Sequence, residues 1–459
     1  MEMAVPSSPL STRFEGHTVA LQTLGCKLNQ AETSAVGKRL EERGFTRVPG
    51  DQAADVYVLN TCSVTENADK ETALLIRRAL RANPSAYVVV TGCYAQLQPE
   101  AVRSIPGVKL VLGSNEKFQI AERLPADLLT SETAVHRCET EALGGFETAW
   151  SLGDRTRAFL KVQDGCDYKC TYCTIPMARG ASRSDTLENV VQQAQKLAES
   201  GVREIVLTGV NTGDYGKGEF GDKKHEHTFL QLIEALDERV EVARIRISSV
   251  EPNLMHPELI RLIASSRRFV PHFHLPLQSG SDAVLGRMKR RYRSELYAER
   301  VRAIRSEVPE ACIGADVITG FPGETEAEFE QTLDFVREHA LDYLHVFTYS
   351  SRPGTEAALL EQVSLAVRKA RTTRLRAMGD RLALLSAERS RGRVLEVLFE
   401  EGKDAEGAEW IEGYTPNYLR VSVPRGSAEP GQLVKVVLKE VLGPGKLRGE
   451  CVPAPILAV

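Results

Sequence analysis

The chain has 459 residues, of which 42% are hydrophobic and 26% are charged, with a formal net charge of −4. These values exclude a disordered or collagen-like chain and predict two or more globular domains. No apolar run reaches membrane-spanning length and the first residues lack a signal-peptide core, so we expect a cytoplasmic protein without membrane contact. Its nine cysteines should then stay reduced, and their odd number and uneven spacing favour metal ligation over disulfides.

The first part of the chain alternates strand and helix. Residues 1–16 are expected to form a disordered tail. In residues 17–130, "HTVALQTLGC" and "DVYVLNTC" precede helices expected around 30–43 and 66–81, and "AYVVVTGC" precedes "QPEAVRSI". Near-continuous apolar runs are typical of parallel strands covered on both faces, so we predict a doubly wound α/β domain. The acidic, Gly-containing residues 131–153 are expected to form a linker.

Each of these three strand candidates ends in a cysteine. Cys26, Cys62 and Cys93 are 36 and 31 residues apart, and each interval is about one β–α unit. A single cysteine at such a place is more often a packing residue. Parallel strands, however, put their carboxyl ends at one edge of the sheet, where α/β sheets bind ligands. We therefore predict that the three thiols converge and hold a metal group.

Residues 154–384 contain six further strand candidates, which are "AFLKV", "EIVLTGV", "VARIRISSV", "FHLPLQ", "CIGADVITGF" and "YLHVFTYS". Helical segments separate most of them, which predicts a (β/α) barrel, partial and six-stranded, with its chemistry at the carboxyl ends of the strands. The first strand is followed by "VQDGCDYKCTYCTIP", in which Cys166, Cys170 and Cys173 form a C-x3-C-x2-C triplet. Three thiolates at this spacing can hold an iron–sulfur cube and leave one iron open. The alternative is a zinc site, which normally needs four protein ligands, and no matching Cys pair or His follows.

The last part of the chain changes character. An Arg-rich helix is expected from 365 to 391, and residues 385–455 contain the short alternating strands "RVLEVLFEEG", "NYLRVSVP" and "GQLVKVVLKEV". Gly and Pro between them predict a small all-β barrel. The basic segments 287–293 and 368–393 favour contact with RNA phosphates, and the alternative for the second is a solvated helix face.

The triplet and its place after the first barrel strand resemble the radical S-adenosylmethionine superfamily. The resemblance implies a [4Fe–4S] cluster whose open iron binds S-adenosyl-L-methionine, a cofactor that yields a 5′-deoxyadenosyl radical. It implies cofactor contacts from the triplet loop and from the segments "TGVN", "SSVEP", "HLPLQSGSD" and "GADVITGFPGE". Turn or core roles remain the alternative for each. The residues implied are Tyr172, Thr208, Gly209, Asn211, Ser249, Glu251, Gln278, Ser279, Arg293 and Asp316.

Two three-cysteine sites in one chain resemble the radical methylthiotransferase family, in which a second [4Fe–4S] cluster supplies sulfur and the last barrel is a TRAM domain that binds RNA. "GYTPNYLRVSVP" carries the TRAM likeness. The segments "TLGCKLNQAET" and "NTCSVTENADKE" are similar to the branch that acts on threonylcarbamoyladenosine at tRNA position 37. The resemblance implies binding of the tRNA anticodon stem-loop and an electron donor such as flavodoxin or ferredoxin. The alternatives are methylthiolation of isopentenyladenosine or of a ribosomal-protein aspartate, and a non-catalytic iron–sulfur RNA-binding protein.

Overall fold

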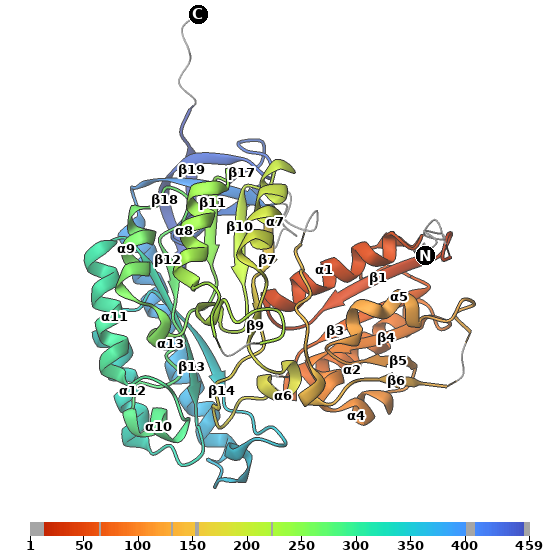
Figure 1. Cartoon of the computed structure of the whole chain (residues 1–459). Helices are drawn as coiled ribbons and strands as arrows, with labels where there is room; N and C mark the ends of the chain where they lie inside the picture. Colours follow the sequence, from red (N-terminus) through yellow and green to blue (C-terminus); the bar gives the residue numbers. More distant parts are fainter. Residues whose placement is uncertain are drawn as a thin grey trace, which may run out of the picture.

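The computed structural model describes residues 13–63, 66–129, 132–151, 156–221, 224–400 and 409–453. Three units are visible in Figure 1, namely an N-terminal sheet, a central barrel of strands with helices outside, and a small C-terminal barrel at its end. Residues 1–12 of the predicted tail lie outside the described residues. Phe14, which belongs to the same predicted tail, is buried and stacks on Phe45, so the folded part begins before residue 17.

The N-terminal unit is a six-stranded parallel sheet in the order β2-β1-β3-β4-β5-β6. Its central strands are wholly buried, and separate apolar clusters cover the two faces, which confirms the doubly wound α/β arrangement. The sixth strand lies inside the predicted linker. The elements are β1 Thr18–Thr23, α1 Lys27–Glu41, β2 Thr46–Val48, β3 Val56–Thr61, α2 Glu66–Ala82, β4 Tyr87–Gly92, α3 Cys93–Leu97, α4 Pro99–Arg103, β5 Val108–Leu112, α5 Ile120–Arg123 and β6 Ala134–His136.

The central unit contains the six predicted strands in two parallel groups, β7-β10-β11 and β12-β13-β14, which isolated bridges join. This confirms the partial, six-stranded barrel. Its strands are β7 Arg157–Lys161, β10 Glu204–Thr208, β11 Arg244–Ile247, β12 His272–His274, β13 Cys312–Thr319 and β14 Tyr343–Thr348. The helices are α6 Ile175–Arg179, α7 Leu187–Glu199, α8 Phe229–Arg239, α9 Pro257–Ser265, α10 Asp282–Arg287, α11 Ser294–Glu307, α12 Glu326–Glu338 and α13 Leu365–Ser390, and β8 Gln163–Asp164 pairs with β9 Arg183–Ser184.

Side chains alternate along the barrel strands between an apolar outer face and a polar interior. Ile205 and Leu207 of β10 and Ile245 of β11 pack with the surrounding helices in one core cluster. The intervening positions on β10 and β11 carry Glu204 and Arg246, which pair with each other inside the barrel. A barrel interior filled with charged and aromatic polar groups can receive a polar ligand, whereas an apolar interior would be a closed core.

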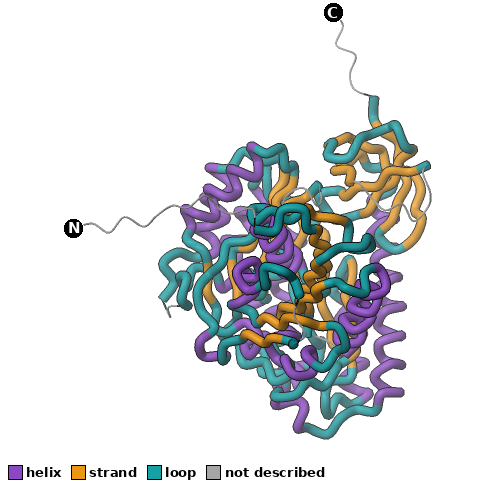
Figure 2. The backbone as a smooth tube through the Cα atoms, turned by 90° about the vertical axis from the view of Figure 1, so that its right-hand side faces the viewer, coloured by secondary structure: helices purple, strands orange, loops and turns teal. Residues whose placement is uncertain are grey.

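The C-terminal unit is a closed five-stranded barrel in the order β15-β16-β17-β19-β18, as predicted for an all-β domain. Its strands are β15 Val394–Glu400, β16 Trp410–Tyr414, β17 Arg420–Pro424, β18 Leu433–Gly443 and β19 Lys446–Cys451. Figure 2 shows it as a compact group of strands at one end of the molecule. Helix α13 continues to Ser390, so the predicted boundary at 385 falls inside a helix. No helix in the described ranges is long and apolar enough to cross a membrane.

Candidate functional site

The triplet cysteines lie in the loop between β8 and α6, at the carboxyl end of the first barrel strand. Backbone amides of Tyr168 and Ile175 donate to the sulfurs of Cys166 and Cys173, each at 3.4 Å. Burial raises the pKa of both of these thiols to about 12. In the free protein they are therefore neutral at physiological pH, and binding a cation is what would favour their thiolate form.

Arg290 is the basic residue that contacts a cysteine of this loop in the described part of the chain, while Arg291 lies over the ring of Tyr168. The Arg290 guanidinium donates to the sulfur of Cys170 at 3.1 Å and to the hydroxyl of Tyr172 at 3.4 Å, and it forms an ion pair with Glu251. Arg293, predicted for the cofactor carboxylate, is instead exposed and donates to a carbonyl of α10. Arg290 thus links two of the predicted residues, Tyr172 and Glu251, to the triplet. The sequence analysis did not single out Arg290.

The other three cysteines lie at one edge of the N-terminal sheet. Cys26 caps the start of α1, Cys62 follows β3 directly, and Cys93 begins α3 after β4. Gly25 has a φ of +102°, and a Cβ there would lie 2.7 Å from the Cβ of Cys62, so only glycine permits this approach of the two loops. Cys26 is the exposed member of the trio, and desolvation by the neighbouring protein, with a smaller effect of Cys93, raises the pKa of its thiol.

The two cysteine sites face each other across the junction of the first two units. Ser63, directly after Cys62, and Thr174, directly after Cys173, are buried with their hydroxyl oxygens 3.4 Å apart. Helices α3 and α6, which begin at or just after a cysteine of each site, pack together. The sequence pattern predicted each trio separately, but only the tertiary structure shows that they are neighbours.

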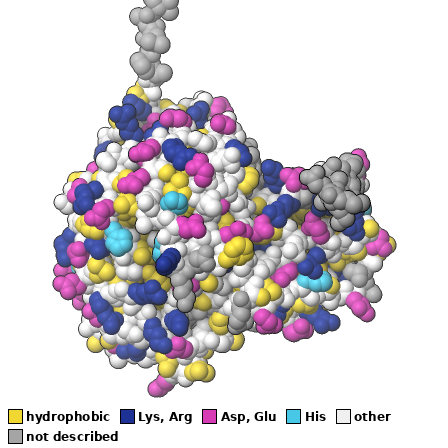
Figure 3. Space-filling view, viewed as in Figure 1, with side chains coloured by type: hydrophobic (Ala, Val, Ile, Leu, Met, Phe, Trp, Pro, Cys, Tyr) yellow, Lys and Arg dark blue, Asp and Glu magenta, His cyan; other side chains and the backbone are white. Residues whose placement is uncertain are grey.

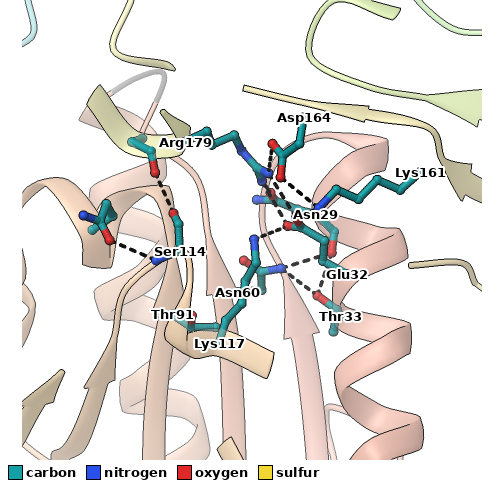
Figure 4. Close-up of polar contacts among 12 residues, drawn as sticks. Asn29, Glu32, Thr33, Asn60, Thr91, Ser114, Lys117, Lys161, Asp164 and Arg179 are labelled. Carbon is teal, nitrogen blue, oxygen red and sulfur yellow. Dashed lines mark hydrogen bonds and ion pairs between the residues drawn. The ribbon is translucent and has the colours of Figure 1, made fainter. Parts of the chain in front are cut away.

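A buried charge network holds this junction together (Figure 4). Arg179 of α6 donates to both oxygens of Glu32 on α1, each at 3.0 Å, and to Oδ1 of Asp164 at 2.9 Å. It also donates to Oδ1 of Asn29 at 2.6 Å. All four residues are at most 2% exposed. A planar guanidinium with this many donors can join two domains in one fixed orientation.

Two lysines complete the network. Lys117 lies 2.6 Å from Oε2 of Glu32, and Lys161 of β7 lies 3.2 Å from its Oε1 and 2.8 Å from Oδ2 of Asp164. Burial by itself would raise the pKa of Glu32, but Arg179 and the two lysines hold it well below the usual range. Glu32 is therefore ionised throughout the physiological pH range.

The spacing of the thiols distinguishes a cluster from a single metal ion. Tetrahedral zinc with sulfur ligands at about 2.3 Å requires sulfurs within about 3.8 Å of one another. In the described parts of the chain, the group of three or more possible ligands whose atoms all lie within 4.8 Å is His274, Asp316 and His345, and it includes no cysteine. The amide–sulfur hydrogen bonds of the triplet, and the supply of three thiols in each trio where zinc wants four ligands, fit an iron–sulfur cube with one open iron.

Two predicted cofactor-binding side chains are already bonded to protein. The hydroxyl of Thr208 donates to the carbonyl of Leu160 at 3.2 Å. The hydroxyl of Ser279 lies 3.1 Å from that of Thr332 on α12, outside the barrel. At these two positions the side-chain hydroxyl is engaged within the protein. The predicted cofactor contact would therefore come from backbone atoms, and it stays a prediction.

Three other predicted residues lie at strand ends. The backbone amide of Asn211 donates to Oε1 of Gln163 at 2.8 Å, whereas its buried side-chain amide lies near the Tyr168 hydroxyl but makes no hydrogen bond of normal geometry among the described residues. A Cβ at Gly209 would lie 3.0 Å from the same oxygen of Gln163. Gln278 has a φ of +61° and exchanges backbone hydrogen bonds with β13. Unpaired buried amide groups of this kind are expected where a ligand supplies the partner.

The remaining predicted residues, Ser249 and Asp316, meet inside the barrel. The hydroxyl of Ser249 lies 2.7 Å from Nδ1 of His274, and Oδ1 of Asp316 lies 3.2 Å from Nε2 of His274 and 3.1 Å from Nδ1 of His345. Burial alone would raise the pKa of Asp316, but His274 and His345 hold it well below the usual range. This polar group on β12, β13 and β14 makes up part of the wall of the barrel interior.

The basic segment 287–293 makes internal contacts to a large extent. Arg287 pairs with Glu328 and Lys289 with Glu356, in addition to the contacts of Arg290. Lys289, Arg291 and Arg293 are nevertheless exposed, and phosphate binding by this segment stays a prediction.

Several arginines of helix α13 likewise pair with carboxylates and carbonyls of the central barrel. The pairs include Arg371 with Glu324, and Arg389 with Asp342. Basic and acidic side chains are interspersed on the face shown in Figure 3. The helix therefore attaches to the central barrel in part through charge, whereas Lys369, Arg381 and Arg391 are exposed, and their contact with RNA stays a prediction.

The chain matches two described families, the Radical SAM superfamily over residues 160–336 and the Uncharacterized protein family UPF0004 over residues 18–113. It is 43% identical to the threonylcarbamoyladenosine tRNA methylthiotransferase MtaB of Bacillus subtilis, with 91% of this chain and 93% of the relative covered. It is 37% identical to the enzyme of that name from Aquifex aeolicus, with 92% and 100% covered.

A differently named relative is the tRNA-2-methylthio-N(6)-dimethylallyladenosine synthase of Desulforamulus reducens, at 34% identity, with 94% of this chain and 95% of the relative covered. Among solved structures, the radical S-adenosylmethionine methyltransferase TsrM of Kitasatospora setae has a TM-score of 0.51 at 16% identity, with 74% and 77% covered, and shows a likeness of fold. The identities above 30% over almost the whole chain, together with the two cysteine sites, show that the chain belongs to the radical S-adenosylmethionine methylthiotransferase family.

Proposed function

We propose that this enzyme adds a methylthio group to C2 of N6-threonylcarbamoyladenosine at position 37 of tRNA. The observation that carries the proposal is the meeting of the two cysteine sites across the junction, shown by the contact between Ser63 and Thr174. Sulfur insertion needs a radical generator and a sulfur donor near the same substrate carbon. Two facing iron–sulfur sites satisfy this requirement, whereas a single cluster would not.

The two trios would have different roles. Cys166, Cys170 and Cys173 would hold the cluster that binds S-adenosylmethionine, and Cys26, Cys62 and Cys93 would hold the auxiliary [4Fe–4S] cluster. When bound, these groups supply a carbon-centred radical able to take hydrogen from an unactivated carbon and a sulfur atom to replace it.

The chain's own residues would bind and orient these groups. Arg290 would hold the loop of the triplet through Cys170 and fix Glu251 beside it. The unpaired amide of Asn211 at the end of β10 would hydrogen bond the bound cofactor. The buried junction around Arg179 would keep water away from the space between the sites, because all its polar members are paired within the protein.

The choice of acceptor rests on the relatives and on the barrel interior. The two relatives at 43% and 37% identity both carry the threonylcarbamoyladenosine name, and a relative at 34% carries the dimethylallyl name. The interior wall contains His274, Asp316 and His345. Such a wall suits the polar threonylcarbamoyl group better than a hydrocarbon, whose burial against these groups would leave their hydrogen bonds unmade.

The partners follow from this substrate. We propose that the C-terminal barrel, assigned to residues 385–455, acts as a TRAM domain that binds the anticodon stem-loop, and that residues 17–130 and 154–384 form the cluster domain and the radical domain. Single-stranded loop bases are reached by splaying them from the stem, which fits an acceptor at position 37. An electron donor of the flavodoxin or ferredoxin type would supply reducing equivalents in the cytoplasm, where the tRNA is.

Nucleoside mass spectrometry of tRNA tests the proposal. Cells lacking the gene should lose 2-methylthio-threonylcarbamoyladenosine and regain it with the wild-type gene but not with Cys62→Ala. Loss of the 2-methylthio derivative of isopentenyladenosine instead would move the assignment to the dimethylallyl branch. Anaerobically reconstituted protein should bind about eight irons and release 5′-deoxyadenosine in the presence of reductant and S-adenosylmethionine. Iron binding without 5′-deoxyadenosine would indicate a non-catalytic RNA-binding protein.

A further inference from the structure

A loop of the C-terminal barrel closes one end of the central barrel. Arg246 of β11 donates to the carbonyl of Pro416 at 3.0 Å and to that of Thr415 at 3.3 Å. Tyr418 in the same loop has a φ of +66°, and its ring lies 4.6 Å from that of His272 on β12. The third unit therefore contributes a side chain to the barrel interior and does more than extend the RNA-binding surface.

Lys27 reaches this closed end from the N-terminal unit. It is the first residue of α1, directly after Cys26, and its ammonium lies 6.0 Å from the ring centre of Tyr418. Arg246 and Arg157 act on Lys27 as like charges, and Glu204 and Asp316 as opposite charges. One residue thus connects the cysteine edge of the sheet, the interior of the central barrel and the loop of the C-terminal barrel.

The charged neighbours of Lys27 already have partners. Glu204 pairs with Arg246 at 2.8 Å, Asp316 with His274 at 3.2 Å, and Arg157 with Glu400 at 2.5 Å. Glu204 and Asp316 act on the Lys27 ammonium only at longer range, and no ion pair or side-chain hydrogen bond joins it to a described carboxylate. A partly buried cation without a close counter-charge is costly, and an anionic ligand reduces that cost. The unmatched charge therefore marks a place for an anion.

The position of Lys27 next to Cys26 fits one part of the substrate. In adenine, C2 and C6 are both bonded to N1, so the carbon that receives sulfur and the nitrogen that carries the substituent lie on the same edge of the base. A pocket for the N6 substituent must therefore adjoin the sulfur donor. The threonylcarbamoyl group carries one full negative charge, on its carboxylate, whereas a dimethylallyl group carries none.

We propose that Lys27, with Tyr418 beside it, is an anion-binding subsite that takes the carboxylate of the threonylcarbamoyl group. The inference rests on the proposed function and names the residue that would give it substrate specificity. Lys27 contributes a point charge that an uncharged N6 substituent leaves without a partner. Tyr418 borders this subsite and ties its position to the docking of the C-terminal barrel.

Binding measurements on the full-length, cluster-reconstituted protein without S-adenosylmethionine test this subsite. The probes are anticodon stem-loop RNAs carrying threonylcarbamoyladenosine, the neutral amide of its carboxyl group, or adenosine at position 37, measured by fluorescence anisotropy. Wild-type protein should bind the acid about tenfold more tightly than the amide, as expected for a hydrogen bond to a charged group. Lys27→Gln should reduce this ratio to below about twofold, and Lys27→Arg should largely retain it.

Lys439→Gln is the matched control, because this lysine is exposed on β18 and pairs with Glu450. It should change the affinity for all three RNAs equally and leave the ratio intact. An unchanged acid-to-amide ratio in a folded Lys27→Gln protein would overturn the subsite. Nucleoside analysis distinguishes failure of the subsite from failure of the proposed function. If wild type makes the threonylcarbamoyl product and Lys27→Gln leaves the ratio intact, the subsite alone fails. If wild type makes the isopentenyl product, the proposed function fails.

Discussion

Glu32 is the carboxylate on which the junction of the first two units depends, and Glu32→Gln tests that dependence. The substitution removes the ion pairs with Lys117 at 2.6 Å, with Arg179 at 3.0 Å and with Lys161 at 3.2 Å, while side-chain volume hardly changes. Breaking a buried pair by neutralising one partner costs about 3–5 kcal/mol, because the remaining charges stay buried. That is a large share of the about 5–15 kcal/mol by which a typical domain is stable.

Urea unfolding followed by the fluorescence of Trp150 measures this loss. Trp150 lies at the junction, where Lys38 of α1 is 5.5 Å from its ring centre, and Trp410→Phe leaves it as the single tryptophan of the chain. With a slope of about 2 kcal/mol per molar urea, a loss of about 4 kcal/mol lowers the midpoint by about 2 M. A midpoint shift below about 0.5 M would refute the assigned role of Glu32.

Glu122→Gln provides the matched control. Glu122 pairs with Arg43 at 2.6 Å on the same domain, but its side chain is 51% exposed. Exposed pairs contribute about 0–1 kcal/mol, so the midpoint should fall by at most about 0.5 M. Similar shifts for both variants would mean that burial does not decide the energy of the junction.

The pH dependence of the Glu32→Gln effect gives a second test. The folded protein holds the pKa of Glu32 below its usual range, whereas the unfolded chain has a value of about 4.3. The contribution of the carboxylate is therefore fully present above about pH 4.3 and is lost as the pH falls toward the folded value. The difference between wild type and Glu32→Gln should be constant from pH 5 to 8 and shrink below about pH 4. A difference that grew on acidification would contradict the sign.

Three further outcomes are expected. Cys62→Ala should bind about four irons in place of about eight, still release 5′-deoxyadenosine and form no methylthio product; retained methylthiolation would overturn its assignment. Arg290→Ala removes a cation that donates to Cys170 and pairs with Glu251, so the reduction potential of the radical cluster should fall. A redox titration followed by electron paramagnetic resonance measures this potential, and Arg290→Lys should give an intermediate value. Phe14→Ala should lower the Trp150 unfolding midpoint by about 1.5–2.5 M, because Phe14 is 1% exposed; an unchanged midpoint would mean that its contacts do not belong to the unit that unfolds.

Local patterns predicted the strands and the thiols that end them, because strand periodicity and Cys spacing are short-range signals. The six barrel strands and the two trios needed no tertiary information. Strand β6 was missed because it has three residues in an acidic, Gly-containing segment and forms only by pairing with β5. Phe14 was missed for a related reason, since one aromatic residue in a Pro- and Ser-rich segment gives no periodicity.

The direction in which a side chain points could not be predicted from the sequence. In the basic segment 287–293, every arginine looks alike, and Arg293 was assigned to the cofactor. Lys289 has a φ of +55°, which turns the chain so that Arg290 points at Cys170 and Arg293 points away. A turn of this kind in a non-glycine residue is not visible in composition. The junction network is equally hidden, because Glu32 and Arg179 are 147 residues apart.

The charge balance of the junction indicates why docking of the two units and cluster binding belong together. Four buried cations, Lys117, Lys161, Arg179 and Arg183, face two buried carboxylates, Glu32 and Asp164, which leaves a surplus of two positive charges. Such a surplus is costly unless an anion lies nearby. Among the neighbours that raise the pKa of Arg179, Glu32 has the largest effect and Cys93 the next largest. A [4Fe–4S]²⁺ core held by three thiolates carries a net charge of about −1, which offsets part of the surplus. Occupation of the proposed auxiliary site would therefore stabilise the junction, and the junction would in turn favour the ionised form of the thiols proposed to hold the cluster.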